Sequence, residues 1–218
     1  MKELTIIIPA FNEESALGKT LEELKPFALK NKWIVIVIND GSSDNTLGIA
    51  SKHDFVNTFS HKINRGYGAS LKTGILKTET DMIAFFDADG QHRFEDLENI
   101  WTKFNDHDMI VGERSKNSYK NANRTIGKWI LSKTANFLSG RKIPDLNSGL
   151  RIVKREVILY YLNLFPDGFS FSTTSTIAFL SDKRLVEYIP ITTNKRTGKS
   201  SVSQIKDGFG TIMLMLRL

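Results

Sequence analysis

The chain has 218 residues, of which 40% are hydrophobic and 25% are charged, and both values are ordinary for a soluble globular protein. It contains no cysteine, which excludes disulfide bonds and thiolate metal sites and favours a cytoplasmic location. No run of about 18 apolar residues occurs, so no segment is predicted to cross a membrane, and the first residues lack a signal peptide's features.

The net charge of +6 hides an asymmetry between the two halves of the chain. Residues 1–113 carry 12 Lys and Arg against 18 Asp and Glu, whereas residues 114–218 carry 18 against 6. The basic half predicts a phosphate-bearing partner, an anionic membrane face or nucleic acid, and a merely solvated basic face is the alternative. Nucleic acid is not expected, because no helix-turn-helix, zinc-finger or RNP signature is present.

The first expected element is a buried strand over residues 4–9, a β-branched run closed by proline. In the loop after it, Asn12 is a candidate N-cap, and the two glutamates that follow favour the start of a helix. Apolar residues then recur at helical spacing over residues 17–28, with Pro26 expected to end or kink the helix. The order is strand, turn and helix.

A second buried strand is expected over residues 33–38, followed by a Gly-Ser-Ser turn into a helix. This leaves Asp40 at the carboxyl edge of the strand, where its carboxylate could accept a hydrogen bond from a base N–H or a ribose hydroxyl. A purely structural turn is the alternative. A weaker strand over residues 55–60 precedes the glycine-rich turn 64–70, which opens a helix and allows close backbone approach to an anion.

The central stretch of the chain is residues 82–92, in which a short apolar strand ends abruptly in Asp87 and Asp89. In open α/β sheets ligands bind outside the carboxyl ends of the strands, so these two acids lie where chemistry is usually done. Such hard oxygen ligands suit Mg²⁺ or Mn²⁺, which usually takes substrate phosphates as further ligands. The combination predicts a metal-held nucleotide diphosphate, and a solvated turn is the alternative.

A helix over residues 97–104 and a strand over residues 109–112 complete four or five alternating units, which imply parallel strands with right-handed crossovers. Beyond residue 113 the regular alternation of strands and helices is no longer expected. An amphipathic helix is expected over residues 126–138, stopped at Gly140. Further expected elements are a strand at residues 152–153, a helix over residues 173–180 and a strand over residues 186–191.

Two features of the basic half bear on function. Asp145 is the only acid in the stretch 114–155, so it either pairs with an arginine structurally or serves as an active-site carboxylate. Near the end, a basic loop over residues 195–200 precedes an apolar helical stripe over residues 202–216, which either packs in the core or lies in a membrane interface. The chain stops at Leu218 while still apolar, which favours a protein that continues beyond it.

Six motifs occur in an order that resembles one protein family. They are Pro9-Ala10-Phe11-Asn12-Glu13, Asn39-Asp40-Gly41-Ser42-Ser43-Asp44-Asn45-Thr46, Asn64-Arg65-Gly66-Tyr67-Gly68, Asp87-Ala88-Asp89-Gly90-Gln91-His92, Asn147-Ser148-Gly149-Leu150-Arg151 and Arg196-Thr197-Gly198-Lys199-Ser200. Together they are similar to the family 2 glycosyltransferases, and within them to the polyprenyl-phosphate glycosyltransferases of the dolichyl-phosphate mannose synthase type. One departure is Gly90, where many relatives carry leucine.

The resemblance implies an α/β GT-A type fold for nucleotide-diphospho-sugar transfer, with a mostly parallel central sheet flanked by helices. It implies one domain over residues 1–200, with a nucleotide-sugar-binding half over residues 1–113 and an acceptor-side half over residues 114–200. Residues 201–218 would then form the C-terminal amphipathic helix.

The resemblance also implies roles for individual residues. The nucleotide-sugar pocket would be formed by Pro9, Phe11, Asn12, Glu13, Asp40, Arg65, Gly66, Asp87 and Ala88. A Mn²⁺ or Mg²⁺ ion would be held by Asp87, Asp89 and Gln91, of which the last two are the more direct ligands. The donor diphosphate and the acceptor phosphate would be held by Arg114, Arg124, Arg196 and Lys199. The implied catalytic residues are Asp89, Asp145 and Arg114.

The implied reaction is a metal-dependent, inverting transfer of sugar from a GDP- or UDP-sugar to a polyprenyl phosphate, undecaprenyl or dolichyl, at the cytoplasmic face of a membrane. In-line displacement on an anionic acceptor needs positioning and charge neutralisation rather than a strong base. The alternative within the class is a hydroxyl acceptor in polysaccharide, lipopolysaccharide or glycoconjugate synthesis, for which Asp145 is the first candidate base. A nucleotidyltransferase and a non-catalytic binding module are the alternatives from other classes.

Overall fold

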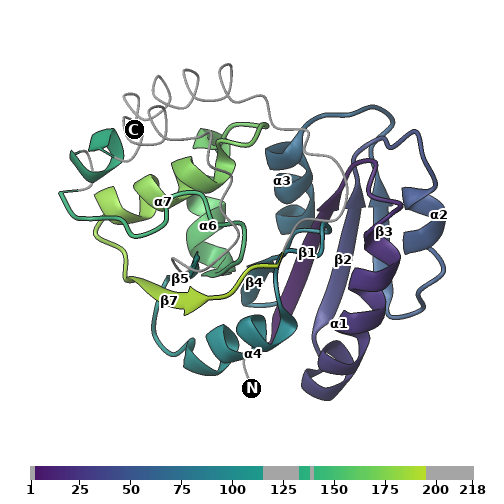
Figure 1. The fold of residues 1–218 in the computed structure, drawn as a ribbon. Helices are drawn as coiled ribbons and strands as arrows, with labels where there is room; N and C mark the ends of the chain where they lie inside the picture. Colours follow the sequence, from purple (N-terminus) through teal and green to yellow (C-terminus); the bar gives the residue numbers. More distant parts are fainter. Residues whose placement is uncertain (1–2, 115–132, 138–139, 195–218) are drawn as a thin grey trace.

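The computed structural model describes residues 3–114, 133–137 and 140–194, and its centre is a seven-stranded sheet (Figure 1). Across the sheet the strand order is β3-β2-β1-β4-β6-β5-β7. The strands are β1 (Leu4–Ala10), β2 (Ile34–Asn39), β3 (Val56–Ser60), β4 (Met82–Phe85), β5 (Met109–Arg114), β6 (Arg151–Lys154) and β7 (Val186–Ile191). All neighbours pair in parallel except β6, which is antiparallel to both β4 and β5. The predicted α/β fold with a mostly parallel sheet is confirmed.

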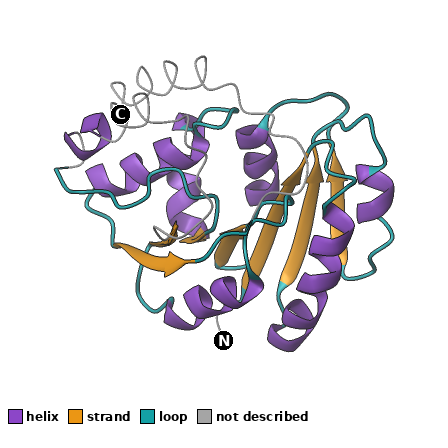
Figure 2. Cartoon of the chain, in the orientation of Figure 1, coloured by secondary structure: helices purple, strands orange, loops and turns teal. Residues whose placement is uncertain are grey.

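Helices cover both faces of the sheet (Figure 2). They are α1 (Leu17–Asn31), α2 (Thr46–Ala50), α3 (Tyr67–Lys77), α4 (Phe94–Lys103), α6 (Arg155–Tyr161), the 3₁₀ turn η1 (Leu162–Leu164) and α7 (Phe171–Ser181). Residues 133–137 are also helical. One apolar layer joins the sheet to α1, α2 and α4, and a second joins it to α3, α6 and α7.

Strand β1 shows why the sequences of the strands are continuous apolar runs. Ile6 and Ile8 point into the layer with α1 and α4, whereas Ile7 points into the layer with α3 and α7. All three are fully buried, because successive side chains alternate between two covered faces. A strand covered on both sides has no polar face, and this is the signal that the sequence carries.

Two expectations about the helices need correction. Helix α1 does not end at Pro26 but continues to Asn31, because Leu24 and Ala28 are buried on either side of an exposed proline. Asn12 is not its N-cap, since the helix begins at Leu17 and Asn12 lies four residues before the Ala16 cap position. Helix α6 was not expected, and the expected helix over residues 126–138 is described only at residues 133–137.

Among the described residues, no helix combines the length and the apolar character needed to cross a membrane. The basic loop over residues 195–200 and the apolar stripe over residues 202–216 lie outside the described residues.

Candidate active site

The predicted site residues gather at one edge of the sheet. Strands β1, β2 and β4 are parallel neighbours or near neighbours, so the loops that follow them all leave from the same edge. Strand β5 runs in the same direction as β4, because both are antiparallel to β6, and it brings Arg114 to this edge. Since β6 runs the opposite way, the turn that precedes it, residues 145–150, lies at this edge as well. The reversed direction of β6 thus brings the turn over residues 145–150 to the same edge as the loops after β1, β2 and β4.

Hydrogen bonds fasten the loop after β1 to the loop after β2. The Asn12 backbone N–H donates to Ser42 Oγ at 3.0 Å, and the Ser43 N–H donates back to Asn12 Oδ1 at 2.9 Å. The Glu13 N–H donates to Thr46 Oγ1 at 2.9 Å. Asn12 adopts a left-handed backbone with φ of 53°, which asparagine tolerates better than most residues. The two loops therefore form one rigid rim.

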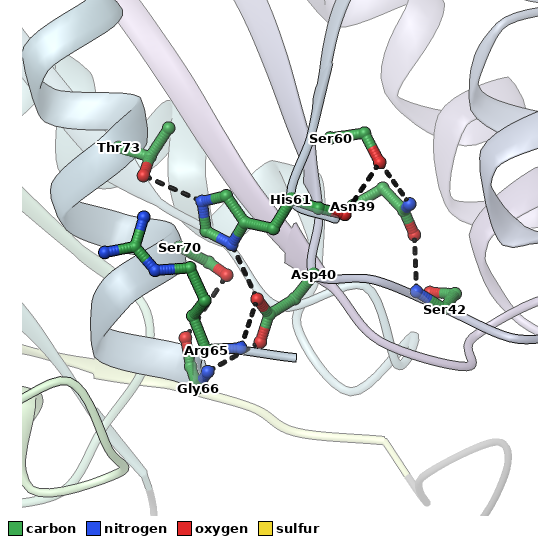
Figure 3. Close-up of polar contacts among 9 residues, drawn as sticks. All are labelled: Asn39, Asp40, Ser42, Ser60, His61, Arg65, Gly66, Ser70 and Thr73. Carbon is green, nitrogen blue, oxygen red and sulfur yellow. Dashed lines mark hydrogen bonds and ion pairs between the residues drawn. The ribbon is translucent and has the colours of Figure 1, made fainter. Parts of the chain in front are cut away.

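Asp40 is buried at the carboxyl end of β2 and organises the loop after β3 (Figure 3). Its Oδ1 accepts the Arg65 backbone N–H at 2.9 Å, and its Oδ2 accepts the Gly66 N–H at 2.8 Å. The Asp40 Oδ1 also lies 2.6 Å from His61 Nδ1, and the other ring nitrogen of His61 lies 2.9 Å from Thr73 Oγ1. A carboxylate can accept about four hydrogen bonds, so three protein donors leave it capacity for a ligand.

Asp87 and Asp89 follow β4 in different environments. The Tyr67 hydroxyl donates to Asp87 Oδ1 at 3.0 Å, and His92 Nε2 lies 3.5 Å from Asp87 Oδ2. Asp89 is 5% exposed, and its Oδ1 accepts the Gln91 backbone N–H at 3.1 Å. Burial raises the pKa of Tyr67 well above its ordinary value, and the charge of Asp87 adds to that shift, so the hydroxyl stays a donor.

The segment with these acids accepts one hydrogen bond from α1 and lies close against the turn before β6. The Ala88 carbonyl accepts the Thr20 hydroxyl from α1 at 3.1 Å. Behind Asp87 lies Gly149, where an added Cβ would stand 2.3 Å from Asp87 Oδ2. Only glycine at this position allows the turn before β6 to approach so closely.

Arg114 and Asp145 form a bidentate ion pair across the site. Arg114 Nε and Nη2 donate to the two carboxylate oxygens of Asp145, each at 2.7 Å, and the Arg114 backbone N–H donates to Oδ2 at 3.2 Å. Burial acts to raise the pKa of Asp145, but the hydrogen bonds and charge of Arg114 outweigh it and hold that pKa below its ordinary value. Asp145 is therefore a poor proton acceptor at neutral pH.

The side-chain oxygen atoms after β4 are of the kind that binds a divalent cation, and a substrate would complete the coordination of such a cation. Asp87, Asp89 and Gln91 carry the hard oxygen atoms that Mg²⁺ and Mn²⁺ prefer. Over the part of the chain that the structure describes, no group of three or more His, Asp or Glu side chains forms a complete metal site. Cations of this kind commonly take water and substrate phosphates as their remaining ligands.

The structure describes most of the predicted site residues. They are Pro9, Phe11, Asn12, Glu13, Asp40, Arg65, Gly66, Asp87, Ala88, Asp89, Gln91, Arg114 and Asp145. Pro9 and Arg114 lie near the ends of β1 and β5, and the others lie on the loops that meet at this edge. Arg124, Arg196 and Lys199 lie outside the described residues.

Sequence reasoning assigned no role to three residues that contact the site. Tyr67 and His92 both reach Asp87, and Arg151 is a fully buried arginine behind the turn that carries Asp145. All three stand inside the six motifs. The sequence shows an aromatic residue, a histidine and an arginine within motifs of mostly small and acidic residues, which singles these three out. Their partners come from distant segments, so the sequence does not show what they contact.

Comparison with known proteins places the chain among glycosyltransferases. An uncharacterized protein of Methanocaldococcus jannaschii is 38% identical over 163 residues, which cover 71% of this chain and 65% of that protein. A UDP-N-acetylglucosamine–dolichyl-phosphate N-acetylglucosaminyltransferase of Methanococcus voltae is 30% identical over 182 residues, 72% of this chain and 71% of that protein. Several other curated relatives are matched over only 53–54% of their length.

A solved structure confirms the fold and a family profile assigns the family. Glucosyl-3-phosphoglycerate synthase from Mycobacterium tuberculosis, in complex with Mn²⁺, UDP-glucose and phosphoglyceric acid, superposes with a TM-score of 0.76 at 14% identity. The superposition covers 99% of this chain and 79% of that one. The profile described as "Glycosyl transferase family 2" matches residues 5–161. Over that span lie the paired acids at the end of β4 and the Arg114–Asp145 pair, and the chain belongs to glycosyl transferase family 2.

Proposed function

We propose that this chain is a metal-dependent, inverting glycosyltransferase that moves a sugar from a nucleotide-diphospho-sugar to a polyprenyl phosphate, undecaprenyl or dolichyl. The observation that carries the proposal is the meeting of the Asp87–Asp89 pair with the Arg114–Asp145 pair at one edge of the sheet. The relative from Methanococcus voltae, named for transfer to dolichyl phosphate, supports the class of acceptor.

The donor would bind on the acidic half. The rim formed by the loops after β1 and β2, together with Asp40, would contact the base and ribose of a GDP- or UDP-sugar. The turn of Arg65 and Gly66, held by Asp40, opens α3 and would lie beside the nucleotide. Residues that hold one another before a ligand arrives lose little freedom on binding, which favours affinity.

A Mn²⁺ or Mg²⁺ ion would be held by Asp87, Asp89 and Gln91 together with the donor diphosphate. When bound, the ion would neutralise the charge that develops on the departing nucleoside diphosphate. Tyr67 and His92 orient Asp87, and the backbone N–H of Gln91 orients Asp89, so both carboxylates keep their positions. The complex of the structural neighbour with Mn²⁺ and UDP-glucose supports this assignment.

The reaction would be a single in-line displacement. An oxygen of the acceptor phosphate forms a bond to the anomeric carbon, while the bond from that carbon to the diphosphate oxygen breaks and its electron pair leaves with the nucleoside diphosphate. The configuration at the carbon inverts. A phosphate monoester is already anionic near neutral pH, so no general base is required.

The state of Asp145 favours this acceptor over a hydroxyl. A hydroxyl acceptor requires a base, and Asp145 is held ionised by two charge-assisted hydrogen bonds from Arg114, which lower its pKa and its basicity. Its part is to orient Arg114, whose positive charge would offset the repulsion between the donor and acceptor phosphates.

The test is a transfer assay with the purified chain, a panel of nucleotide sugars, Mn²⁺ or Mg²⁺ and a short polyprenyl phosphate. We expect nucleoside diphosphate and lipid-linked sugar in equal amounts, and their loss on chelation and in Asp89→Asn. Asp54→Asn is the matched control, because the Asp54 side chain is 85% exposed and pairs with Lys25 at 3.4 Å. Donor binding that depends on metal, without transfer to the lipid phosphate, would contradict the proposed acceptor and point to a hydroxyl. Release of pyrophosphate would indicate a nucleotidyltransferase.

We infer that the enzyme acts in contact with the cytoplasmic face of a membrane, because the proposed acceptor is a membrane lipid. Residues 201–218, which lie outside the described residues, are the proposed interfacial helix. Flotation with liposomes of anionic lipid should recover the intact chain and lose a chain that ends near Ser201. Equal recovery of both would contradict the interfacial helix.

A further inference from the structure

Arg151 is the largest side chain among those that are fully buried, with 0% of its surface exposed. It opens β6, opposite Phe85 on β4 and Val111 on β5, at the edge of the sheet where the site lies. Burying a guanidinium removes it from water at a large cost in free energy, so its hydrogen-bond partners decide what it does.

The hydrogen bonds from Arg151 to oxygen atoms all go to neutral acceptors. Nη1 donates to the Ser172 carbonyl at 2.9 Å, to Ser175 Oγ at 3.0 Å and to Thr176 Oγ1 at 3.1 Å. Nη2 donates to the Ser148 carbonyl. Within the described residues, no carboxylate is hydrogen-bonded to this guanidinium. A well-packed apolar side chain of similar volume would avoid the desolvation cost, so stability alone does not account for arginine here.

These partners belong to two segments that flank the site. Ser148 belongs to the turn before β6, which also carries Asp145, whereas Ser172, Ser175 and Thr176 form the first turns of α7. A second link joins the same segments, because the Thr173 hydroxyl donates to Asn147 Oδ1. One side chain on the sheet thus fastens the turn to the helix.

The same turn carries one end of the ion pair across the site. Asp145 is held by Arg114 on β5, and its Oδ1 also accepts the Asn147 backbone N–H at 3.2 Å. Burial lowers the pKa of Arg151, and the charges of Tyr67, Tyr188, Asp145 and Asp87 oppose that shift. The buried guanidinium therefore lies close enough to interact electrostatically with the carboxylates of Asp145 and Asp87. A displacement of the turn would therefore move the Arg114–Asp145 pair relative to Asp87.

We propose that Arg151 is a positioning residue. Its planar guanidinium group holds the turn over residues 145–149 against α7 and so places Arg114 for the incoming acceptor phosphate. The effect of Arg151 on transfer to the acceptor rests on the proposed function. Its effect on the attachment of the turn to α7 does not. Lysine cannot replace this guanidinium group, because an ammonium group is a point charge that does not span two acceptors in fixed geometry.

The kinetic test compares Arg151→Met and Arg151→Lys with the matched control Arg155→Met. Arg155 begins α6 directly after β6, at the opposite end of that strand from the turn. We expect Arg151→Met to lower kcat/KM for the lipid phosphate about 10- to 100-fold, as for a displaced site group, with donor affinity changed less than about twofold. Arg151→Lys should recover only part of this loss, and Arg155→Met should resemble the wild type. Wild-type turnover in Arg151→Met, or equal losses of donor affinity and turnover, would overturn the proposal.

A second measurement needs neither donor nor acceptor. Hydrogen–deuterium exchange should show faster exchange in residues 145–151 and 171–176 of the Arg151 variants, with the loops after β1 and β2 unchanged. Unchanged exchange in those two segments, or faster exchange throughout the described residues, would overturn the positioning role. Should Arg151→Met fail to fold, Arg151→Lys carries the same comparison. If the wild type transfers to no lipid phosphate, the proposed function fails while this exchange experiment still decides the role of Arg151.

Discussion

At the scale of single residues, the Arg114–Asp145 pair makes stability depend on pH in a defined direction. The pKa of Asp145 is lower in the folded chain than its ordinary value of 3.8. A carboxyl group with a lowered pKa contributes stability above its unfolded pKa and loses it as the pH falls through its folded pKa. The contribution of the pair is therefore complete near neutral pH.

We predict that Asp145→Asn lowers the free energy of unfolding by about 1–2 kcal/mol at pH 7, less than a fully buried pair would, because 38% of the Arg114 side chain is exposed. Urea unfolding at a series of pH values should show this difference shrinking below about pH 4. Asp54→Asn, the exposed control, should change stability little at any pH. A cost for Asp145→Asn that stays constant down to strong acid would refute the assignment.

Gly149 offers a second test at the same scale, since an added Cβ would stand 2.3 Å from Asp87 Oδ2. Asp87 cannot retreat without losing the hydrogen bond from Tyr67. We predict that Gly149→Ala keeps the fold but lowers transfer about 10- to 100-fold through displacement of Asp87. Gly168→Ala is the matched control, because a Cβ added at Gly168 would meet no heavy atom within 4 Å. Similar activities of the two variants would argue against the close contact.

At the scale of elements, helix α1 carries an exposed proline in its interior. Proline removes one backbone hydrogen bond and clashes with the preceding turn, whereas alanine is the best helix former. We predict that Pro26→Ala raises the free energy of unfolding by about 1–3 kcal/mol, partly offset by the greater freedom of the unfolded chain. Urea unfolding measures the gain, with Glu22→Ala at an exposed position one turn earlier as the control. A loss of stability in Pro26→Ala would show that the proline is needed where it stands.

At the scale of the whole molecule, Asp87 from the acidic half and Arg114 from the basic half lie at the same edge of the sheet. The proposed ligands should bind only the folded chain. A ligand at about 100 times its Kd stabilises the folded state by about 2.7 kcal/mol. We predict that a nucleoside diphosphate with Mn²⁺ raises the melting temperature, and that chelation or Asp89→Asn abolishes the rise. A rise that persists without metal, or in Asp89→Asn, would contradict the proposed metal site.

The class of fold and the position of the acids are predictable from local sequence patterns. Runs such as residues 35–38 are apolar at every position because both faces of the sheet are covered there, and that signal is local. The pair of acids directly after β4 is equally local, so its place at a carboxyl edge followed from the strand alone. Composition within about ten residues was sufficient for these conclusions.

Which side chains meet depends instead on how distant segments of the chain pack together. The reversal of β6, the pairing of Arg114 with Asp145 across 31 positions and the bond from Tyr67 to Asp87 across 20 positions join segments whose spacing carries no shared periodicity. The same holds for Arg151, a charged residue in a basic stretch that the sequence would place in solvent and that the fold buries completely. Local patterns determine strands and turns, whereas contacts between distant segments depend on topology, and here the contacts orient the site.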